Sequence, residues 1–478
     1  MMGSVMRLPS GLLASLLSLL ALGGATACGP ATDVGRAEAP AAGEASVDQG
    51  VEPYNVVLVV MDALRADRLS LYGNPRPTSP YLDALARQGV VFRNAYSQAP
   101  WTPSSMASLF TSTYQSVHGV THSLAQDERF SVLDDDLVTL TETFHDAGYR
   151  TAAFSSQAWL LPQTGFSQGF EVFEKVSGIE NIFESEVVVG HGIEWLQRHR
   201  EDPVFLYLHI LNPHSPYEPP PPFSRLWWRG EVPEQLRPMK RMNIDERWQF
   251  LSALGERPVS REEIDYLLAM YDGEISYADY WLGRLARELR RLGLFERTIL
   301  VLTSDHGESF SQHGEFGHGT SLYNDQLHVP LVLVNPRLFP RGRERQEPVE
   351  LIDLMPTLLA VTGLPIPDQV QGESLLAAEL SATVYAEGRK LRQQKWMQDD
   401  WSLIASDGFR NFELYDLSAD PGENHNLWDE QPEIALRLKK ALAEQIRANR
   451  RHPDRIAPDE RPLEAEVLDE LRSLGYLQ

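Results

Sequence analysis

Five polar residues of metal-binding type come just after apolar runs that predict buried strands: Asp62, Asn212, His214, Asp305 and His306. In open α/β sheets, ligands bind at the carboxyl ends of strands, so these side chains should meet at one sheet edge. Carboxylates together with imidazoles suit zinc or manganese, whereas calcium and magnesium prefer shells made of oxygen alone. The sequence therefore predicts a divalent metal site, with zinc or manganese favoured over calcium or magnesium.

Thr102 is the candidate nucleophile and lies in the segment APWTPSSMASLFTS. Pro103 suits the first turn of a helix, which predicts Thr102 at the N-cap. A helix N-terminus stabilises a phosphate or sulfate through its free N–H groups and its dipole. A hydroxyl at that position becomes a useful nucleophile when a metal ion lowers its pKa. A capping role alone is the other interpretation of Thr102.

His318 lies in a glycine-rich loop, FGHGTSLY, further along the chain. One interpretation makes it a ligand of a second metal ion or a contact to the substrate. The other makes it a loop histidine that faces solvent. The sequence leaves both open.

The elements that must position these residues alternate between strands and helices. Apolar runs predict strands buried on both faces, as in a parallel sheet, at residues 55–61, 151–155, 204–210, 298–303 and 329–334. Helical patterns lie between them at residues 80–88, 137–147, 187–198 and 261–292. This alternation predicts an α/β fold with a mostly parallel sheet between helices, over residues 53–378.

The last hundred residues have a different pattern. Short strand-like pieces cover residues 385–417, and helical stretches follow at 432–449 and 463–474. We expect residues 379–478 to form a small C-terminal α+β subdomain that packs on the main domain.

The N-terminus predicts export from the cytoplasm. Arg7 and the apolar run 11–24 indicate a signal peptide that ends at residue 27, since the run is shorter than the roughly 20 residues that span a bilayer. Cys28 is the chain's one cysteine and resembles the lipid-modified cysteine of bacterial lipoproteins, with a free cysteine as the alternative. Residues 28–52 predict a flexible linker. We expect a protein anchored at the cell envelope or in the periplasm.

The charge of the chain bears on its partners. The formal net charge is -24, and no long run of Lys or Arg is present. A surface for nucleic acid needs a basic stripe, so nucleic acid is not an expected partner. Contact with a membrane is expected only through a lipid on Cys28. The sequence does not indicate whether the protein is a monomer or an oligomer.

A series of segments resembles the sulfatase family of the alkaline phosphatase superfamily, from Tyr54 to the C-terminus. The segments follow in family order: NVVLVVMDALRAD, TSPYLDALARQGVVFRNAYS, GYRTAAF, HILNPHSPYEPP, TSDHGE, LHVPLVLVNP, ELIDLMPTLLAVTGLP and ELYDLSADPGENHNL. The resemblance implies an alkaline-phosphatase-like fold and metal-dependent hydrolysis of sulfate or phosphate esters. It implies that Asp62, Asp305 and His306 bind metal, that Thr102 is the nucleophile, and that His214 contacts the substrate or its leaving group.

The chain departs from the family at the nucleophile. Classical sulfatases carry Cys or Ser there, which is oxidised to formylglycine, in a motif that also contains an Arg; here Thr102 and Met106 stand at these positions. The usual paired aspartates are Asp62-Ala63. A Thr nucleophile resembles the phosphorus-directed relatives, such as phosphonate hydrolases and phosphoglycerol or phosphoethanolamine transferases. One metal ion is expected, and His214 and His318 are candidates for a second.

These observations predict a metal-dependent hydrolase or transferase of sulfate or phosphate esters. In this hypothesis a metal ion held by Asp62, Thr102, Asp305 and His306 activates the Thr102 hydroxyl, and His214 binds the leaving group or acts as an acid. The alternative is an envelope lipoprotein that keeps the fold but binds glycans or a partner without catalysis.

Overall fold

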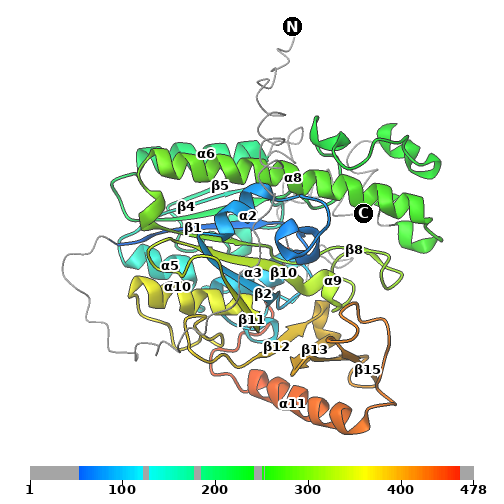
Figure 1. Ribbon diagram of the computed structural model, residues 1–478. Coiled ribbons are helices and arrows are strands. Elements are labelled where there is room, and N and C mark those ends of the chain that lie inside the picture. Colours follow the sequence, from blue (N-terminus) through cyan, green and yellow to red (C-terminus); the bar gives the residue numbers. More distant parts are fainter. Residues whose placement is uncertain (1–52, 122–128, 177–184, 242–249, 252, 463–478) are drawn as a thin grey trace, which may run out of the picture. The chain divides into compact units, whose positions relative to one another are not determined.

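The computed structural model describes residues 53–121, 129–176, 185–241, 250–251 and 253–462 (Figure 1). The expected signal peptide, the linker with Cys28 and the helix at 463–474 lie outside these residues, so they stay predictions. No helix within the described ranges is long and apolar enough to cross a membrane.

An eight-stranded sheet forms the centre of the fold, in the order β11-β2-β10-β7-β1-β6-β4-β5. Its strands are β1 (Asn55–Met61), β2 (Gly89–Tyr96), β4 (Arg150–Ser155), β5 (Val172–Lys175), β6 (Val204–Ile210), β7 (Thr298–Thr303), β10 (His328–Val334) and β11 (Arg343–Glu350). All five apolar runs expected to be strands are strands. The mostly parallel α/β fold is therefore confirmed.

Strand β10 corrects one part of the prediction. It pairs antiparallel with both β2 and β7, whereas the other neighbours in the sheet are parallel. The run 329–334 was expected in a parallel sheet because it is apolar on both faces. An apolar run indicates that a strand is buried on both faces, and β10 is buried as β1 and β7 are. The run does not indicate whether the strand is parallel or antiparallel to its neighbours.

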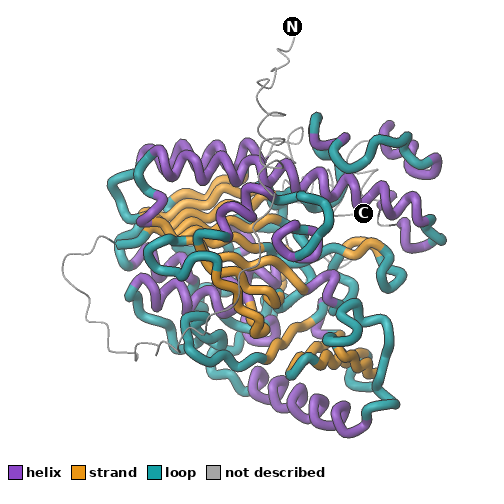
Figure 2. The backbone as a smooth tube through the Cα atoms, viewed as in Figure 1, coloured by secondary structure: helices purple, strands orange, loops and turns teal. Residues whose placement is uncertain are grey.

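Helices cover both faces of the sheet (Figures 1 and 2). The longer ones are α2 (Pro80–Ala86), α3 (Thr102–Thr111), α5 (Leu140–Asp146), α6 (Ser185–Arg198), α8 (Arg261–Arg291) and α10 (Leu354–Thr362), and the short ones are α4 (Gln115–His118) and α9 (Asn324–Leu327). Alternate residues of β1 enter opposite cores. Val57, Val59 and Met61 pack with α2, α6 and α8, while Val56, Leu58 and Val60 pack with α3, α5 and α10. Because successive side chains of a strand point to opposite faces of the sheet, β1 is packed on both faces and lies in the middle of the structure.

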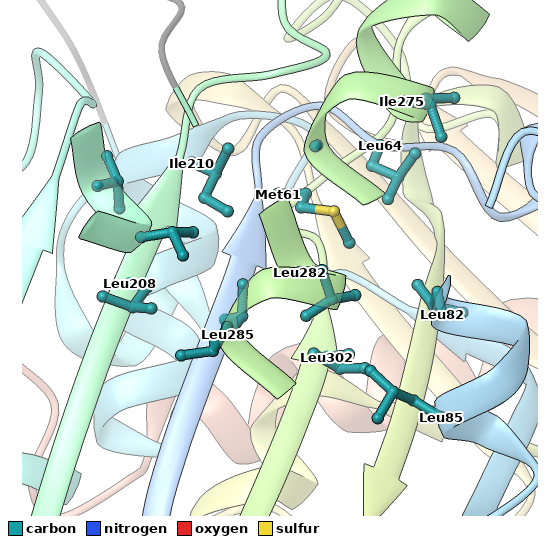
Figure 3. Close-up of a cluster of buried hydrophobic side chains, with 14 of the residues drawn as sticks. Met61, Leu64, Leu82, Leu85, Leu208, Ile210, Ile275, Leu282, Leu285 and Leu302 are labelled. Atoms are coloured by element: carbon teal, nitrogen blue, oxygen red, sulfur yellow. The ribbon is translucent and has the colours of Figure 1, made fainter. Parts of the chain in front are cut away.

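Figure 3 shows the first of these cores. Met61 on β1 and Leu302 on β7 point toward Leu282 and Leu285 of α8. These side chains are at most 2% exposed. Since this packing holds the last residues of β1 and β7 in place, it also holds the polar residues that follow them.

The C-terminal region forms a second, antiparallel sheet, as expected. Its strands are β12 (Thr383–Glu387), β13 (Gln393–Gln398), β14 (Trp401–Ser406) and β15 (Asn411–Asp416), and helix α11 (Pro432–Arg450) packs on it. The small strands β3 (Arg129–Ser131), β8 (Ser309–Phe310), β9 (Phe316–Gly317) and β16 (Glu460–Pro462) form two-stranded sheets.

A buried ion pair links strand β13 to the segment that follows β15. Lys395 Nζ lies 2.7 Å from Glu423 Oε1, and both side chains are fully buried. We expect Glu423→Ala to lower the free energy of unfolding by about 3–5 kcal/mol, because it leaves the ammonium of Lys395 buried without its counter-ion. Urea unfolding measures this change. Asp399→Ala, which breaks the exposed pair of Asp399 with Arg437, is the matched control and should cost about 1 kcal/mol or less.

Candidate active site

Four of the five polar residues predicted at the strand ends, Asp62, His214, Asp305 and His306, meet at one sheet edge. The side chain of the fifth, Asn212, instead accepts a hydrogen bond from Ser185 and donates one to Glu274. The strands β6, β1 and β7 are parallel neighbours, so their carboxyl ends lie together. Asp62 N donates to Ile210 O at 2.9 Å, and Ala63 N donates to Asp305 Oδ1 at 3.1 Å. Asp62 and Asp305 are fully buried. The backbone after β1 therefore holds both carboxylates against each other.

Thr102 is the first residue of α3, and Trp101 is the N-cap. The expectation that Thr102 is the N-cap was wrong by one residue, because the helix begins before Pro103 rather than at it. No side-chain capping bond is present at this end. Instead, Thr102 Oγ1 lies 3.2 Å from His306 Nε2 and accepts a hydrogen bond from Gln157 Nε2 at 3.2 Å. The hydroxyl thus faces the cluster of predicted ligands.

Asp62 is held by a chain of hydrogen bonds. Gln157 Nε2 donates to Asp62 Oδ2, and His209 Nε2 lies 3.2 Å from the same oxygen. The Tyr207 hydroxyl lies 2.5 Å from His209 Nδ1. Because an ionised carboxylate can only accept, His209 donates from Nε2 to Asp62 and accepts from Tyr207 at Nδ1. His209 therefore orients Asp62.

The imidazole of His306 has the opposite tautomer. His306 Nδ1 lies 2.8 Å from the carbonyl oxygen of Gly307 and donates to it, which leaves a lone pair on Nε2. That atom lies 3.6 Å from Asp62 Oδ1 and 3.5 Å from Asp305 Oδ2. Within the described part of the chain, neither of these two buried oxygens has a hydrogen-bond partner. Two carboxylate oxygens and the lone pair of His306 Nε2 therefore converge.

The ionisation of this cluster is unfavourable without a cation. Burial and the nearby charge of Asp305 raise the pKa of Asp62 to about 7. Burial lowers the pKa of His209 to about 4 and that of His318 to about 3. The pKa of His306 is also lowered, mainly by burial. The imidazoles are consequently neutral near pH 7, the form in which histidine binds a metal.

These residues fit a divalent cation. The donor atoms would be Asp62 Oδ1, Asp305 Oδ2, His306 Nε2 and Thr102 Oγ1, the same set that the sequence predicts. Among the described residues, the ligand atoms of Asp62, His209 and Asp305 all lie within 4.8 Å of one another, so His209 is a rival of His306 for the imidazole position. We favour His306 because the only lone pair of His209 faces Tyr207. The identity of the cation, for which the sequence favours zinc or manganese, stays a prediction.

His214 and His318 lie beside this cluster. The ring of His318 is 4.3 Å from that of His306 and 4.8 Å from that of His214. His318 Nδ1 lies 3.0 Å from Glu308 Oε1, and its side chain is only 9% exposed. His318 therefore does not extend into solvent but adjoins the candidate site. His214 Nδ1 lies 2.7 Å from the carbonyl oxygen of Ser215, to which it donates.

Sequence reasoning missed Gln157, His209 and Glu308. His209 carries a weak signal, since it is a polar residue inside the apolar run VFLYLHI. Its strand register beside Val60 places it near Asp62, but that register is not visible in the sequence. Gln157 has no such signal, because a single glutamine after a strand is common and its two contacts are distant in the chain.

Gln157 gives a testable prediction. We expect Gln157→Leu to lower kcat by about tenfold to a hundredfold, because it removes the donor shared by Asp62 and Thr102 and leaves both oxygens less stabilised. Steady-state kinetics on an ester substrate measures the change. Thermal melting checks the fold. A fall in kcat that matches the loss of folded protein would contradict this role.

Comparison with known proteins finds sulfatases among both the family models and the curated relatives. Residues 54–364 match the family model of sulfatases, and residues 312–452 match that of the C-terminal part of N-sulphoglucosamine sulphohydrolase. Arylsulfatase K of Homo sapiens is 26% identical over 463 residues, which cover 84% of each chain. An arylsulfatase of Clostridium perfringens is 26% identical and covers 82% of this chain and 94% of its own.

Solved structures share the fold. A protein in complex with its substrate, D-glucosamine-2-N,6-O-disulfate, superimposes with a TM-score of 0.68 at 19% identity over 84% of this chain and 99% of its own. A phosphonate monoester hydrolase of Agrobacterium radiobacter does so with a TM-score of 0.66 at 22% identity over 83% of this chain and 95% of its own. The sulfatase family model spans well over half of the sequence. The chain belongs to the sulfatase family.

Proposed function

We propose that the protein hydrolyses sulfate monoesters, with the hydroxyl of Thr102 as the nucleophile. The observation that carries this proposal is the position of Thr102 Oγ1, at the start of α3 and facing His306 Nε2 and Gln157 Nε2. The relatives called arylsulfatases support the substrate class. The phosphonate monoester hydrolase supports phosphorus esters as further substrates.

Asp62, Asp305 and His306 would hold a divalent cation, together with Thr102. When bound, the cation lowers the pKa of a hydroxyl and offsets negative charge on the oxygens of the reacting group. The protein's own part is to hold the two carboxylates in position, which the donors Gln157 Nε2 and Ala63 N do.

In the first half of the reaction, Thr102 Oγ1 attacks sulfur. The bond from sulfur to the leaving oxygen breaks, and a Thr102–O–sulfur ester forms. The proton lost by the hydroxyl is balanced by the one gained by the leaving oxygen, which departs as the alcohol or phenol. Gln157 Nε2 donates to the attacking oxygen, and the start of α3 points its dipole toward the anion.

In the second half, water attacks sulfur, the Thr102–O–sulfur bond breaks, and the hydroxyl is restored. His214 is suited to take the proton of this water, because its lowered pKa keeps it neutral and its Nδ1 proton is used on Ser215. The sequence leaves two other roles open for His214, binding the leaving group or acting as an acid. An acid role requires the charged imidazole, which burial disfavours.

Thr102 also sets this chemistry apart from formylglycine chemistry. The Cβ of threonine carries a methyl group, so its oxidation cannot give an aldehyde. The covalent ester must therefore be released by water at sulfur or phosphorus, rather than by elimination from an aldehyde hydrate. This is the reason to test phosphorus esters beside sulfate esters.

A substrate panel tests the proposal. The purified protein is given zinc or manganese and assayed on 4-nitrophenyl sulfate, 4-nitrophenyl phosphate and 4-nitrophenyl phenylphosphonate. We expect hydrolysis with the highest kcat/KM on the sulfate. Faster hydrolysis of a phosphorus ester would show that phosphorus esters, rather than sulfate esters, are the preferred substrates. Failure on all three, together with no bound metal, would favour the non-catalytic alternative.

A further inference from the structure

Arg389 extends from the C-terminal sheet toward the candidate active site. It lies in the turn between β12 and β13, and its Cζ is 5.1 Å from the centre of the Trp101 ring. It also adjoins Gly319, where a Cβ atom would come within 2.7 Å of Arg389 Nε. The guanidinium therefore lies close to both Trp101 and Gly319, and the contact with Gly319 depends on the absence of a side chain there.

Both of these neighbours adjoin residues of the site. Trp101 directly precedes Thr102, and Gly319 directly follows His318. The positive charge of Arg389 contributes, after burial, to the lowered pKa of His318. Since the ring of His318 is 4.3 Å from that of His306, Arg389 stands at the rim of the candidate site.

The turn that carries Arg389 is fixed to the main domain. Gln115 Nε2 donates to Gly388 O at 2.8 Å, and Lys390 N donates to Thr121 O at 2.9 Å. Arg389 itself is exposed and makes no ion pair or hydrogen bond through its guanidinium with any residue that the structure describes. Other arginines near the site are paired: Arg65 with Asp67, and Arg68 with Asp272. Arg389 is thus a positioned cation whose guanidinium has no acidic or hydrogen-bonding partner among the described residues.

We propose that Arg389 binds a second anionic group of the substrate, a carboxylate or sulfate on the leaving-group portion. This inference rests on the proposed function. A guanidinium presents a rigid fork of N–H donors that matches the two oxygens of a carboxylate or sulfate. Its position at the rim places it against the part of the substrate beyond the scissile ester. The preferred substrate is then a polyanionic sulfate ester.

Paired aryl sulfates test this proposal. 4-Nitrophenyl sulfate is compared with analogues that carry a carboxylate at ring position 2 or 3. We expect the wild type to prefer at least one carboxylated analogue. Arg389→Gln should lower kcat/KM on that analogue by about tenfold and change kcat/KM on 4-nitrophenyl sulfate by less than about twofold. Arg389→Lys should restore part of the preference, since it keeps the charge but not the fork.

Arg392→Gln is the matched control, because it removes one exposed positive charge from the same turn. It should leave the preference unchanged. A wild type without preference for either analogue, or an equal loss on all esters in Arg389→Gln, would overturn the proposal. In both cases hydrolysis of 4-nitrophenyl sulfate would leave the proposed function intact. No hydrolysis of any ester by the wild type would instead overturn the proposed function, and this proposal with it.

Discussion

Replacement of Thr102 by alanine is expected to lower kcat on aryl esters by at least about a thousandfold. In the proposed mechanism the hydroxyl supplies the attacking oxygen, and no other hydroxyl of the described residues forms a hydrogen bond with His306 Nε2. The fold should be retained, because the side chain of Thr102 does not cap α3. Thr102→Ser keeps the oxygen and should retain a measurable part of the activity.

Steady-state assays of the two variants, with circular dichroism and thermal melting beside them, check this expectation. Thr111→Ala is the matched control: it removes a buried threonine hydroxyl from the same helix, one that donates to Ala107 O. It should lower stability slightly and leave kcat nearly unchanged. Undiminished turnover by the Thr102→Ala protein would show that another group attacks the ester.

Replacement of Asp62 by asparagine is expected to remove both metal binding and activity while it stabilises the metal-free protein. The loss in kcat should again be about a thousandfold or more, because one of two anionic ligands is lost. The gain in stability has a separate cause. Burial and Asp305 raise the pKa of Asp62 to about 7, so the ionised carboxylate above that pH destabilises the fold without a cation.

The sign follows from linkage. The unfolded chain releases the Asp62 proton near its ordinary pKa, whereas the metal-free fold keeps it up to about pH 7. Stability contributed by this group therefore falls between these values and stays low above them. At pH 8, in the presence of a chelator, Asp62→Asn should melt at a higher temperature than the wild type. With zinc or manganese added, the order should reverse. A variant that melts lower in both conditions would indicate that Asp62 is structural.

Most of the fold could be predicted because its strands are short apolar runs with clear ends. The run at Asn55–Met61 is a strand over those same residues, and so are the runs at Val204–Ile210 and Thr298–Thr303. The strand β2 was not among the apolar runs predicted as strands. The direction of β10 could not be inferred, because residues on both faces of a central strand are buried whichever way it runs.

The candidate site was predictable where chemistry follows a strand end. Asp62 follows β1, and Asp305 and His306 follow its neighbour β7, so residue type and position sufficed to bring them together. Gln157 and Arg389 were not predictable, since each depends on contacts between distant segments. The tautomers of His209 and His306 likewise depend on neighbours, Tyr207 and Gly307, that only the folded chain brings within hydrogen-bond distance.

The most direct test of the account is to find the covalent ester on Thr102. The protein is mixed with 4-nitrophenyl sulfate, quenched with acid within the first turnovers, digested, and analysed by peptide mass spectrometry. The account predicts a sulfuryl group on the peptide that contains Thr102, formed as 4-nitrophenol is released and absent in Asp62→Asn. A burst of 4-nitrophenol stoichiometric with the protein, with Thr102 unmodified or the ester on another residue, would contradict it.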